Sequence, residues 1–273
     1  MALAARRVCT RAGKPFALFL HGTGVEPRHS GGYDDGLWAE IAEAIRHADG
    51  LLVTTEYVRD FLVRPLVDVE KERFLILPCG IDLDEFHPGR DDGVAARYDL
   101  PARYVICPGA LTHSKGPQNV VAAAREYADL AYTVLIGDGE LRPQLENDLA
   151  DRGRCLGFVP AADKAFLING ATLLVAAPVK KEHFGIIYAE ALSGGTPCVA
   201  YEGGGVDSIV TPDVGVLTQR DPEALGRGVR RLLEDDRKRE SMEVNARRRA
   251  EERFDAVELG AQLEDWLAGL VQA

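Results

Sequence analysis

The chain has 273 residues, 46% of them hydrophobic, which is enough for one large domain or two ordinary domains with cores of their own. Its 43 acidic and 32 basic residues give a formal net charge of −11, which argues against a nucleic-acid partner because binding a phosphate backbone needs a positive field. The five cysteines form no Cys-x-x-Cys pair, so no zinc site is indicated and a cytoplasmic location is expected. No apolar run reaches the roughly 20 residues of a membrane span, so no transmembrane helix is indicated.

Residues 1–88 predict a small α/β domain. Apolar runs predict three strands, at Phe16–Leu20, Leu51–Thr54 and Phe74–Leu77. Helices are expected near Leu37–Ala48 and Glu56–Leu66. Three strands make only about half of a usual doubly wound domain. We therefore expect an uncovered sheet edge, which favours a homo-oligomer or a partner subunit.

The stretch Pro78–Gly89 is rich in turn residues and reads as a hinge between two domains. It places the first domain at residues 1–88 and the second at residues 89–273. Within it, Asp82-Leu83-Asp84 imitates a DxD metal site of other enzymes. Because this tripeptide lies in the hinge, we do not expect it to bind a metal.

From Arg103 onward, strands alternate with helices. Apolar runs predict strands at Tyr104–Cys107, Tyr132–Ile136, Cys155–Leu156, Leu173–Ala176, Cys198–Tyr201 and Gly215–Leu217. The stretch from Pro222 to Arg253 reads as solvated amphipathic helix. This alternation is typical of βαβ units and predicts a doubly wound parallel sheet.

Glycines follow several of these strands, among them Gly109, Gly137, Gly157 and the run Gly203–Gly205. The carboxyl ends of parallel strands share the edge at which open α/β sheets bind ligands. Glycines there allow the backbone to approach a ligand closely, although glycine also serves simply to make tight turns.

Two glutamates, Glu182 and Glu190, flank the start of an apolar helix that Gly194 and Gly195 close. The amides between them are placed at a helix amino end, where unpaired donors and the helix dipole favour a phosphate or sugar oxygen. Ionised carboxylates accept hydrogen bonds and suit pairs of hydroxyl groups. The segment predicts a nucleotide-sugar pocket, although two glutamates at this spacing also occur by chance in many soluble proteins.

This pair of glutamates resembles the Glu-x7-Glu motif of retaining glycosyltransferases with the GT-B fold, family 4 in particular. Further segments similar to that family are Leu77–Asp82, Pro108–Gly116, Ile136–Arg142 and Leu156–Pro160. The resemblance extends over nearly the whole chain from about Lys14. It implies a GT-B-like α/β fold with a complete, doubly wound, Rossmann-like carboxyl-terminal domain and a truncated amino-terminal α/β domain.

The resemblance implies a binding site for a nucleoside-diphosphate sugar donor. Glu182 would hold the sugar hydroxyls, Glu190 the ribose, and Lys115 the diphosphate. The remaining donor-binding residues would be Gly109, Gly157, Phe158, Val159, His183, Phe184, Gly185 and Ile186. The base would lie against the Gly157–Val159 loop.

The implied reaction transfers the sugar to an unidentified acceptor with retention of anomeric configuration. Candidate catalytic residues are Glu182 and His21, which resembles a histidine facing the acceptor, although a lone histidine is more often structural. No metal and no other cofactor is expected, since a lysine and helix-end amides would stabilise the leaving diphosphate.

The chain also departs from the family. Ala110 stands where the diphosphate-binding loop has an arginine, Cys79 replaces a hinge asparagine, and Asp207 and Ser208 stand where a later loop has Pro-Glu. The resemblance further implies that roughly the first hundred residues of a full-length enzyme are missing. Two alternatives therefore stay open: a nucleotide-sugar-binding module or degenerate subunit that needs a partner chain, and a nucleotide-sugar 2-epimerase of the same fold.

Overall fold

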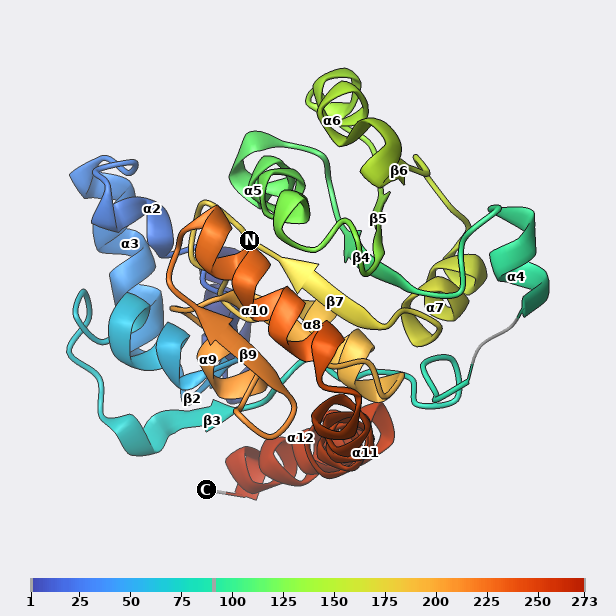
Figure 1. Ribbon diagram of the computed structural model, residues 1–273. Coiled ribbons are helices and arrows are strands. Elements are labelled where there is room, and N and C mark those ends of the chain that lie inside the picture. Colours follow the sequence, from blue (N-terminus) through green and yellow to red (C-terminus); the bar gives the residue numbers. More distant parts are fainter. Residues whose placement is uncertain (1, 90–91, 273) are drawn as a thin grey trace. The chain divides into compact units, whose positions relative to one another are not determined.

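A computed structural model describes residues 2–89 and 92–272 and shows two compact units (Figure 1). The first combines the chain up to Gly80 with the segment from Ala256 onward, and the second spans Ile81–Asp255. This division differs from the predicted boundary after residue 88, and it assigns the C-terminal helix to the first unit. Among the described residues, no helix has both the length and the apolar character that a membrane span requires.

The second unit contains a six-stranded parallel sheet with the order β6-β5-β4-β7-β8-β9. The strands are β4 (Tyr104–Pro108), β5 (Tyr132–Ile136), β6 (Gly153–Cys155), β7 (Leu173–Ala176), β8 (Cys198–Tyr201) and β9 (Gly215–Thr218). From β4 the sheet grows to one side through β5 and β6, and to the other through β7, β8 and β9. Such a reversal leaves a crevice at the carboxyl ends of β4 and β7, where doubly wound sheets bind ligands. The predicted α/β fold class is confirmed.

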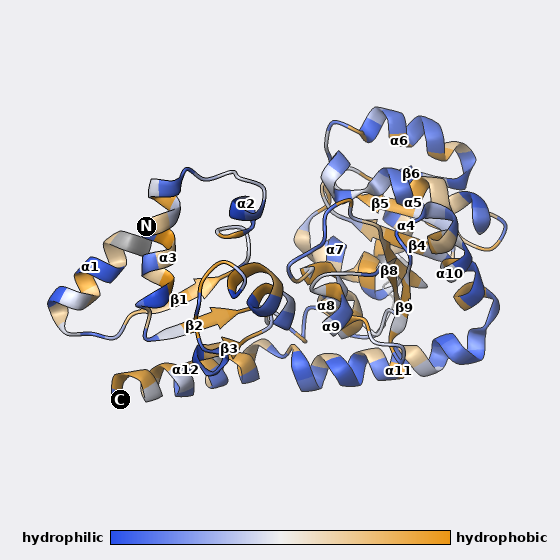
Figure 2. Ribbon diagram, turned by 90° about the vertical axis from the view of Figure 1, so that its left-hand side faces the viewer, coloured by the Kyte–Doolittle hydropathy of each residue, from blue (hydrophilic) through white to orange (hydrophobic). Residues whose placement is uncertain are grey.

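Helices cover both faces of this sheet. They are α4 (Asp92–Arg97), α5 (Pro117–Ala123), α6 (Arg142–Leu149), α7 (Ala161–Asn169), α8 (Ile186–Ser193), α9 (Val206–Ile209), α10 (Pro222–Glu234) and α11 (Asp236–Arg253). On one face, Val105 and Leu135 share a core with α5 and α10. On the other, the Tyr104 hydroxyl donates to the Leu167 carbonyl of α7 at 2.7 Å. Figure 2 shows hydrophobic strands inside and mostly hydrophilic helices α6 and α11 outside.

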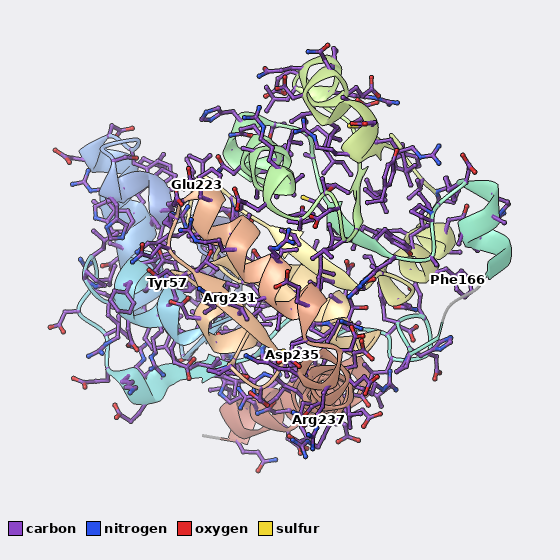
Figure 3. The ribbon with its side chains drawn as sticks, in the orientation of Figure 1. Tyr57, Phe166, Glu223, Arg231, Asp235 and Arg237 are labelled. Atoms are coloured by element: carbon purple, nitrogen blue, oxygen red, sulfur yellow. The ribbon has the colours of Figure 1, made fainter. Side chains whose placement is uncertain are left out.

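Helix α10 illustrates how the sequence pattern sets this packing. Asp221 caps its amino end by accepting a hydrogen bond from the amide three residues later, at 2.8 Å. Leu225 and Val229 are buried in the core, whereas Glu223 and Arg231 are exposed (Figure 3). The predicted amphipathic stretch is thus confirmed, as two helices, α10 and α11.

The first unit contains a three-stranded parallel sheet with the order β1-β2-β3. Its elements are β1 (Ala17–Leu20), β2 (Gly50–Val53), β3 (Phe74–Ile76), α1 (Ala2–Ala12), α2 (Glu26–His29), α3 (Asp35–Arg46) and α12 (Ala256–Gln272). The three predicted strands are confirmed to within one residue at each end. The helix predicted over residues 56–66 is a π-helix, Val58–Val63, whose wider turn the apolar spacing does not distinguish from an α-turn.

The C-terminal helix α12 belongs to the first unit because it packs against that unit's sheet. A Cβ built on Gly50 in β2 would lie 2.5 Å from the Trp266 ring and 2.8 Å from Leu270, so both side chains rest directly on the strand. The domain predicted over residues 89–273 therefore extends too far. Helical spacing alone does not show which sheet a helix covers.

Candidate active site

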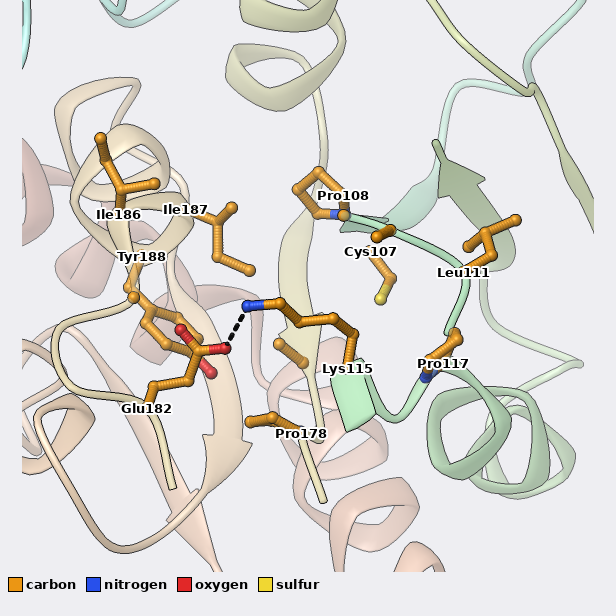
Figure 4. A pocket seen from close by; sticks show the side chains of 14 residues that line it. Cys107, Pro108, Leu111, Lys115, Pro117, Pro178, Glu182, Ile186, Ile187 and Tyr188 are labelled. Carbon is orange, nitrogen blue, oxygen red and sulfur yellow. Dashed lines mark hydrogen bonds and ion pairs between the residues drawn. The ribbon is translucent and has the colours of Figure 1, made fainter. Parts of the chain in front are cut away.

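A small pocket opens at the carboxyl edge of the second unit's sheet, beside the ends of β4 and β7 (Figure 4). Its volume is about 90 Å³, well below the ~300–1,000 Å³ of pockets that enclose a whole ligand. It therefore fits a phosphate-sized fragment. It is lined by Cys107, Pro108, Gly109, Ala110, Leu111, Lys115, Pro117, Ala176, Pro178, Glu182, Gly185, Ile186, Ile187 and Tyr188.

The loop after β4 forms one wall of the pocket. It ends in a single 3-10 turn, His113–Lys115, followed by Gly116 in the left-handed conformation at φ 70°. A Cβ on Gly116 would clash with the Ala177 carbonyl oxygen just after β7. Glycine thus lets the two loops touch, and this contact places Lys115 at the pocket.

Lys115 and Glu182 meet across the pocket from opposite walls. Lys115 Nζ lies 2.9 Å from Glu182 Oε1, as the dashed line in Figure 4 marks. The lysine side chain is 52% exposed and the glutamate 20%. The structure therefore brings together the two residues predicted to contact the diphosphate and the sugar, and each neutralises the other.

The amino end of α8 forms the floor beside Glu182. Gly185 has a φ of 90°, and a Cβ there would lie 2.5 Å from the Tyr188 ring, so glycine is required for this close approach. Gly185 and Ile186 line the pocket, and their role in donor binding stays a prediction. His183 and Phe184 do not line it, and the Phe184 ring is buried edge-on to Phe254, with ring centroids 6.1 Å apart.

Glu190 lies apart from this pocket. It is only 7% exposed, and its Oε1 accepts a hydrogen bond from Lys164 Nζ in α7 at 2.7 Å. Burial raises the pKa of Glu190, and Lys164 opposes that rise. Among the described residues, no group donates a hydrogen bond to its buried Oε2. The sequence did not predict Lys164, because no motif links these two helices.

The loop predicted to hold the base lies at the end of β6. Its Gly157 carbonyl accepts a hydrogen bond from the Gly137 amide at 2.9 Å, so the loops after β5 and β6 lie side by side. Val159 is buried, whereas Phe158 is 88% exposed. None of these residues lines the small pocket.

His21 belongs to the first unit, where it follows β1 and lies with its ring centroid 3.9 Å from that of Phe19. Its catalytic role stays a prediction. Asp82 Oδ1 accepts hydrogen bonds from the amides of Asp84 and Glu85, so the DxD-like tripeptide forms a turn. Within the described part of the chain, no cluster of three or more His, Cys, Asp or Glu residues is arranged to hold a metal ion.

Several pocket residues were not predicted. Leu111, Ala176, Pro178, Ile187 and Tyr188 supply apolar walls. They belong to no motif of their own: Leu111, Ala176 and Pro178 lie at or after the ends of the paired strands β4 and β7, and Ile187 and Tyr188 lie in α8. Tyr188 had one indirect signal, since it follows Gly185 by a single helical turn.

Comparison with known sequences places these residues in a family. The sequence model described as "Glycosyl transferases group 1" matches residues 97–249, which include Lys115, Glu182 and Glu190. A D-inositol 3-phosphate glycosyltransferase of Xylanimonas cellulosilytica is 30% identical over 241 residues, which make up 82% of this chain and 57% of that protein. A GDP-mannose-dependent phosphatidylinositol dimannoside mannosyltransferase of Mycobacterium tuberculosis is 28% identical over 233 residues, or 78% of this chain and 57% of the relative.

The chain therefore spans little more than half the length of these relatives. Among solved structures, Anabaena HepE in complex with UDP-glucose superposes with a TM-score of 0.83 at 20% identity. The match covers 98% of this chain and 76% of that one. At this identity the likeness supports the fold, which is of the GT-B type.

Proposed function

The chain belongs to the group 1 glycosyl transferases, and from that membership we propose that it transfers a sugar from a nucleoside-diphosphate donor to an acceptor. One observation carries the proposal: Lys115 faces Glu182 at the amino end of α8, in the crevice between β4 and β7. A cation, helix-end amides and a carboxylate in one crevice suit a diphosphate attached to a sugar.

The diphosphate lies between Lys115 and the amides at Gly185 and Ile186. These donors stabilise the charge that develops when it leaves, and they do so without a metal ion or another cofactor. Glu182 then accepts hydrogen bonds from the sugar hydroxyls. Lys115 and Glu182 are paired with each other at 2.9 Å. When the donor binds between them, Lys115 pairs with the diphosphate and Glu182 with the sugar hydroxyls in place of their mutual contact.

The rest of the donor extends along the sheet edge. Gly109 lets the backbone approach the diphosphate, Glu190 accepts hydrogen bonds from the ribose, and the Gly157–Val159 loop lies against the base. Glu190 is buried, so its carboxylate reaches the ribose only if the side chain shifts from its pairing with Lys164.

The reaction retains the anomeric configuration. The bond from the anomeric carbon to the diphosphate oxygen breaks, and the bond to the acceptor oxygen forms on the same face of the sugar. The acceptor proton passes to the departing diphosphate oxygen. His21, in the first unit, serves the acceptor side.

A second candidate is a binding subunit that needs a partner chain for transfer. Ala110 favours this second candidate, because its methyl group lines the pocket at the position where the diphosphate-binding loop of the family has an arginine. With Lys115 as the only lysine or arginine among the pocket-lining residues described, the leaving diphosphate receives less positive charge.

Calorimetry on the pure chain tests the donor site. Lys115→Ala should weaken binding of a nucleoside diphosphate by about 1.5–3 kcal/mol and leave the nucleoside unaffected, because it removes charged hydrogen bonds to phosphate. Lys238→Ala, an exposed lysine on α11, is the matched control. Equal affinity of the Lys115 variant for the diphosphate would contradict the site, and loss of binding on chelation would contradict the metal-free proposal. Release of sugar from the donor, with its anomer read by NMR, separates a transferase from a binding subunit.

A further inference from the structure

The loops after β5 and β6 form one joined surface at the edge of the sheet. The Gly137 amide donates to the Gly157 carbonyl at 2.9 Å, and the two residues make an isolated antiparallel bridge. Gly157 is buried and has a φ of 73°, a conformation that favours glycine. The surface is therefore fixed by backbone contacts.

Arg142, the first residue of α6, lays its guanidinium on this surface. A Cβ built on Gly157 would lie 2.6 Å from Nη1, 3.3 Å from Cζ and 3.4 Å from Nη2, so the guanidinium lies directly against this glycine. Nε donates to Glu146 Oε1 at 2.8 Å, and Nη1 donates to Asp138 Oδ2 at 3.3 Å. Two carboxylates thus hold the guanidinium in one orientation.

This anchoring leaves part of the guanidinium available. Among the described residues, none accepts a hydrogen bond from Nη2, and the side chain is 33% exposed. Phe158, the residue after Gly157, is 88% exposed, although exposing a phenylalanine ring to water is unfavourable. An anchored donor group and an exposed aromatic ring therefore occur together at the edge where the proposed donor places its base.

We propose that Arg142 selects guanine as the base of the donor, with Phe158 stacking on the base. The inference rests on the proposed function, because it assumes that a nucleotide occupies this edge. It adds the identity of the base, which neither the pocket nor the family fixes.

The choice of guanine follows from hydrogen-bonding patterns. The end of the guanidinium offers two adjacent donors, one N–H of Nη2 and the second N–H of Nη1, whose other N–H is directed at Asp138, and guanine presents two adjacent acceptors, O6 and N7. Adenine and cytosine present an amino donor on the corresponding edge, and uracil presents a single carbonyl oxygen there. Stacking on Phe158 does not discriminate between bases, since every base has a π-face.

The test is calorimetry of the full chain with GDP and UDP. We expect the wild type to bind GDP about 5- to 150-fold more tightly, the discrimination that one bidentate arginine contact provides. Arg142→Met should bring the two affinities close together, and so should Arg142→Lys, which keeps the charge but loses the paired donors. Phe158→Ala should weaken both nucleotides by a similar factor.

Arg227→Gln, which removes an exposed arginine paired with Glu223 on α10, is the matched control and should leave both affinities unchanged. Thermal unfolding without ligand shows whether the variants are folded. Equal or tighter binding of UDP by the wild type overturns the inference, and so does a parallel loss of both nucleotides in Arg142→Met. Absence of binding by either nucleotide overturns the donor site itself, and the two failures are thus distinguishable.

Discussion

Glu182 and Glu190 each pair with a lysine, but the two ion pairs lie in different surroundings. Lys115 is 52% exposed, so its pair with Glu182 contributes only about 0–1 kcal/mol to stability. The Glu190 side chain is 9% exposed and its Lys164 partner 31%. Removal of that lysine leaves a buried charge unpaired, which is far more costly. The first pair is therefore easily exchanged for a ligand, whereas exchange of Lys164 for the ribose at Glu190 requires the shift of a buried side chain.

The exposed pair leads to a prediction for Glu182→Ala. This variant should damage recognition of the sugar, yet bind a bare nucleoside diphosphate as well as the wild type or up to about fivefold more tightly, because Lys115 no longer has an internal partner. Calorimetry with the diphosphate and with the nucleotide sugar measures both effects. An equal loss of affinity for the two ligands would refute the separate roles of Lys115 and Glu182.

The buried pair predicts a pH dependence of stability. The pKa of Glu190 in the folded protein lies above its ordinary value of 4.5. The protonated side chain therefore adds to the free energy of unfolding below about pH 4.5, and this stabilisation is lost as the pH rises through the folded pKa. Glu190→Gln should remove this loss. Lys164→Met should move it to higher pH, because the lysine lowers the pKa. Urea unfolding from pH 4.5 to 8 measures the profiles, and an unchanged profile in Glu190→Gln would contradict the assignment.

The sequence predicted those site residues that belong to a recognisable motif. Lys115 and Glu182 were expected in one site because each stands in a recognisable motif, and the structure joins them at 2.9 Å. Lys164 and the apolar pocket residues were not expected, because a contact between two helices leaves no local pattern. Arg142 was noticed only as the last residue of a motif.

At the level of elements, glycines control how closely the loops after the strands approach one another. Gly116 lies against the Ala177 carbonyl, and Gly185 against the Tyr188 ring. Both have positive φ values, 70° and 90°. The pocket therefore depends on backbone contacts between loops as well as on its polar side chains.

Two glycines of the same loop allow a matched comparison. Gly109→Ala should cost about 1–3 kcal/mol of unfolding free energy, because φ is 146°, yet its Cβ would meet no described atom within 4 Å. Gly116→Ala should cost more, since it adds a clash with the Ala177 carbonyl. Chemical denaturation measures both. Equal costs would show that the contact between the loops is not tight.

The elements themselves were largely predictable. Most strands in the described residues are short apolar runs, and each overlaps a predicted strand, although β6 shares only Cys155 with the strand predicted there. The π-helix at Val58–Val63 was not, because its apolar spacing resembles that of an α-helix. The placement of α12 was also missed, because Trp266 contacts Gly50 far away in sequence.

At the level of the whole molecule, the first unit has an open sheet edge. In the described part of the chain no strand pairs with the outer side of β1, where Phe19 is 40% exposed. Phe61, on the π-helix, is 66% exposed. Unpaired edges and exposed apolar side chains favour association.

We therefore expect the pure chain to assemble beyond a monomer and to turn over donor slowly, because an acceptor that is poorly positioned costs several kcal/mol of activation free energy. Light scattering and a donor-turnover assay measure the two properties. A monomer that transfers sugar at ordinary enzyme rates, about 1–10³ per second, would refute this expectation.

Helix α12 belongs to the first unit although it follows the second unit in sequence, and this order has a consequence for biosynthesis. The residues that cover Gly50 leave the ribosome only after the whole of Ile81–Asp255 has been made. At a translation rate of roughly 5–20 residues per second, α12 is synthesised on the order of ten seconds or more after strands β1 to β3. The second unit is one continuous segment with a core of its own, so we expect it to fold meanwhile. A chaperone that binds nascent apolar strands should therefore engage this protein at its amino-terminal part.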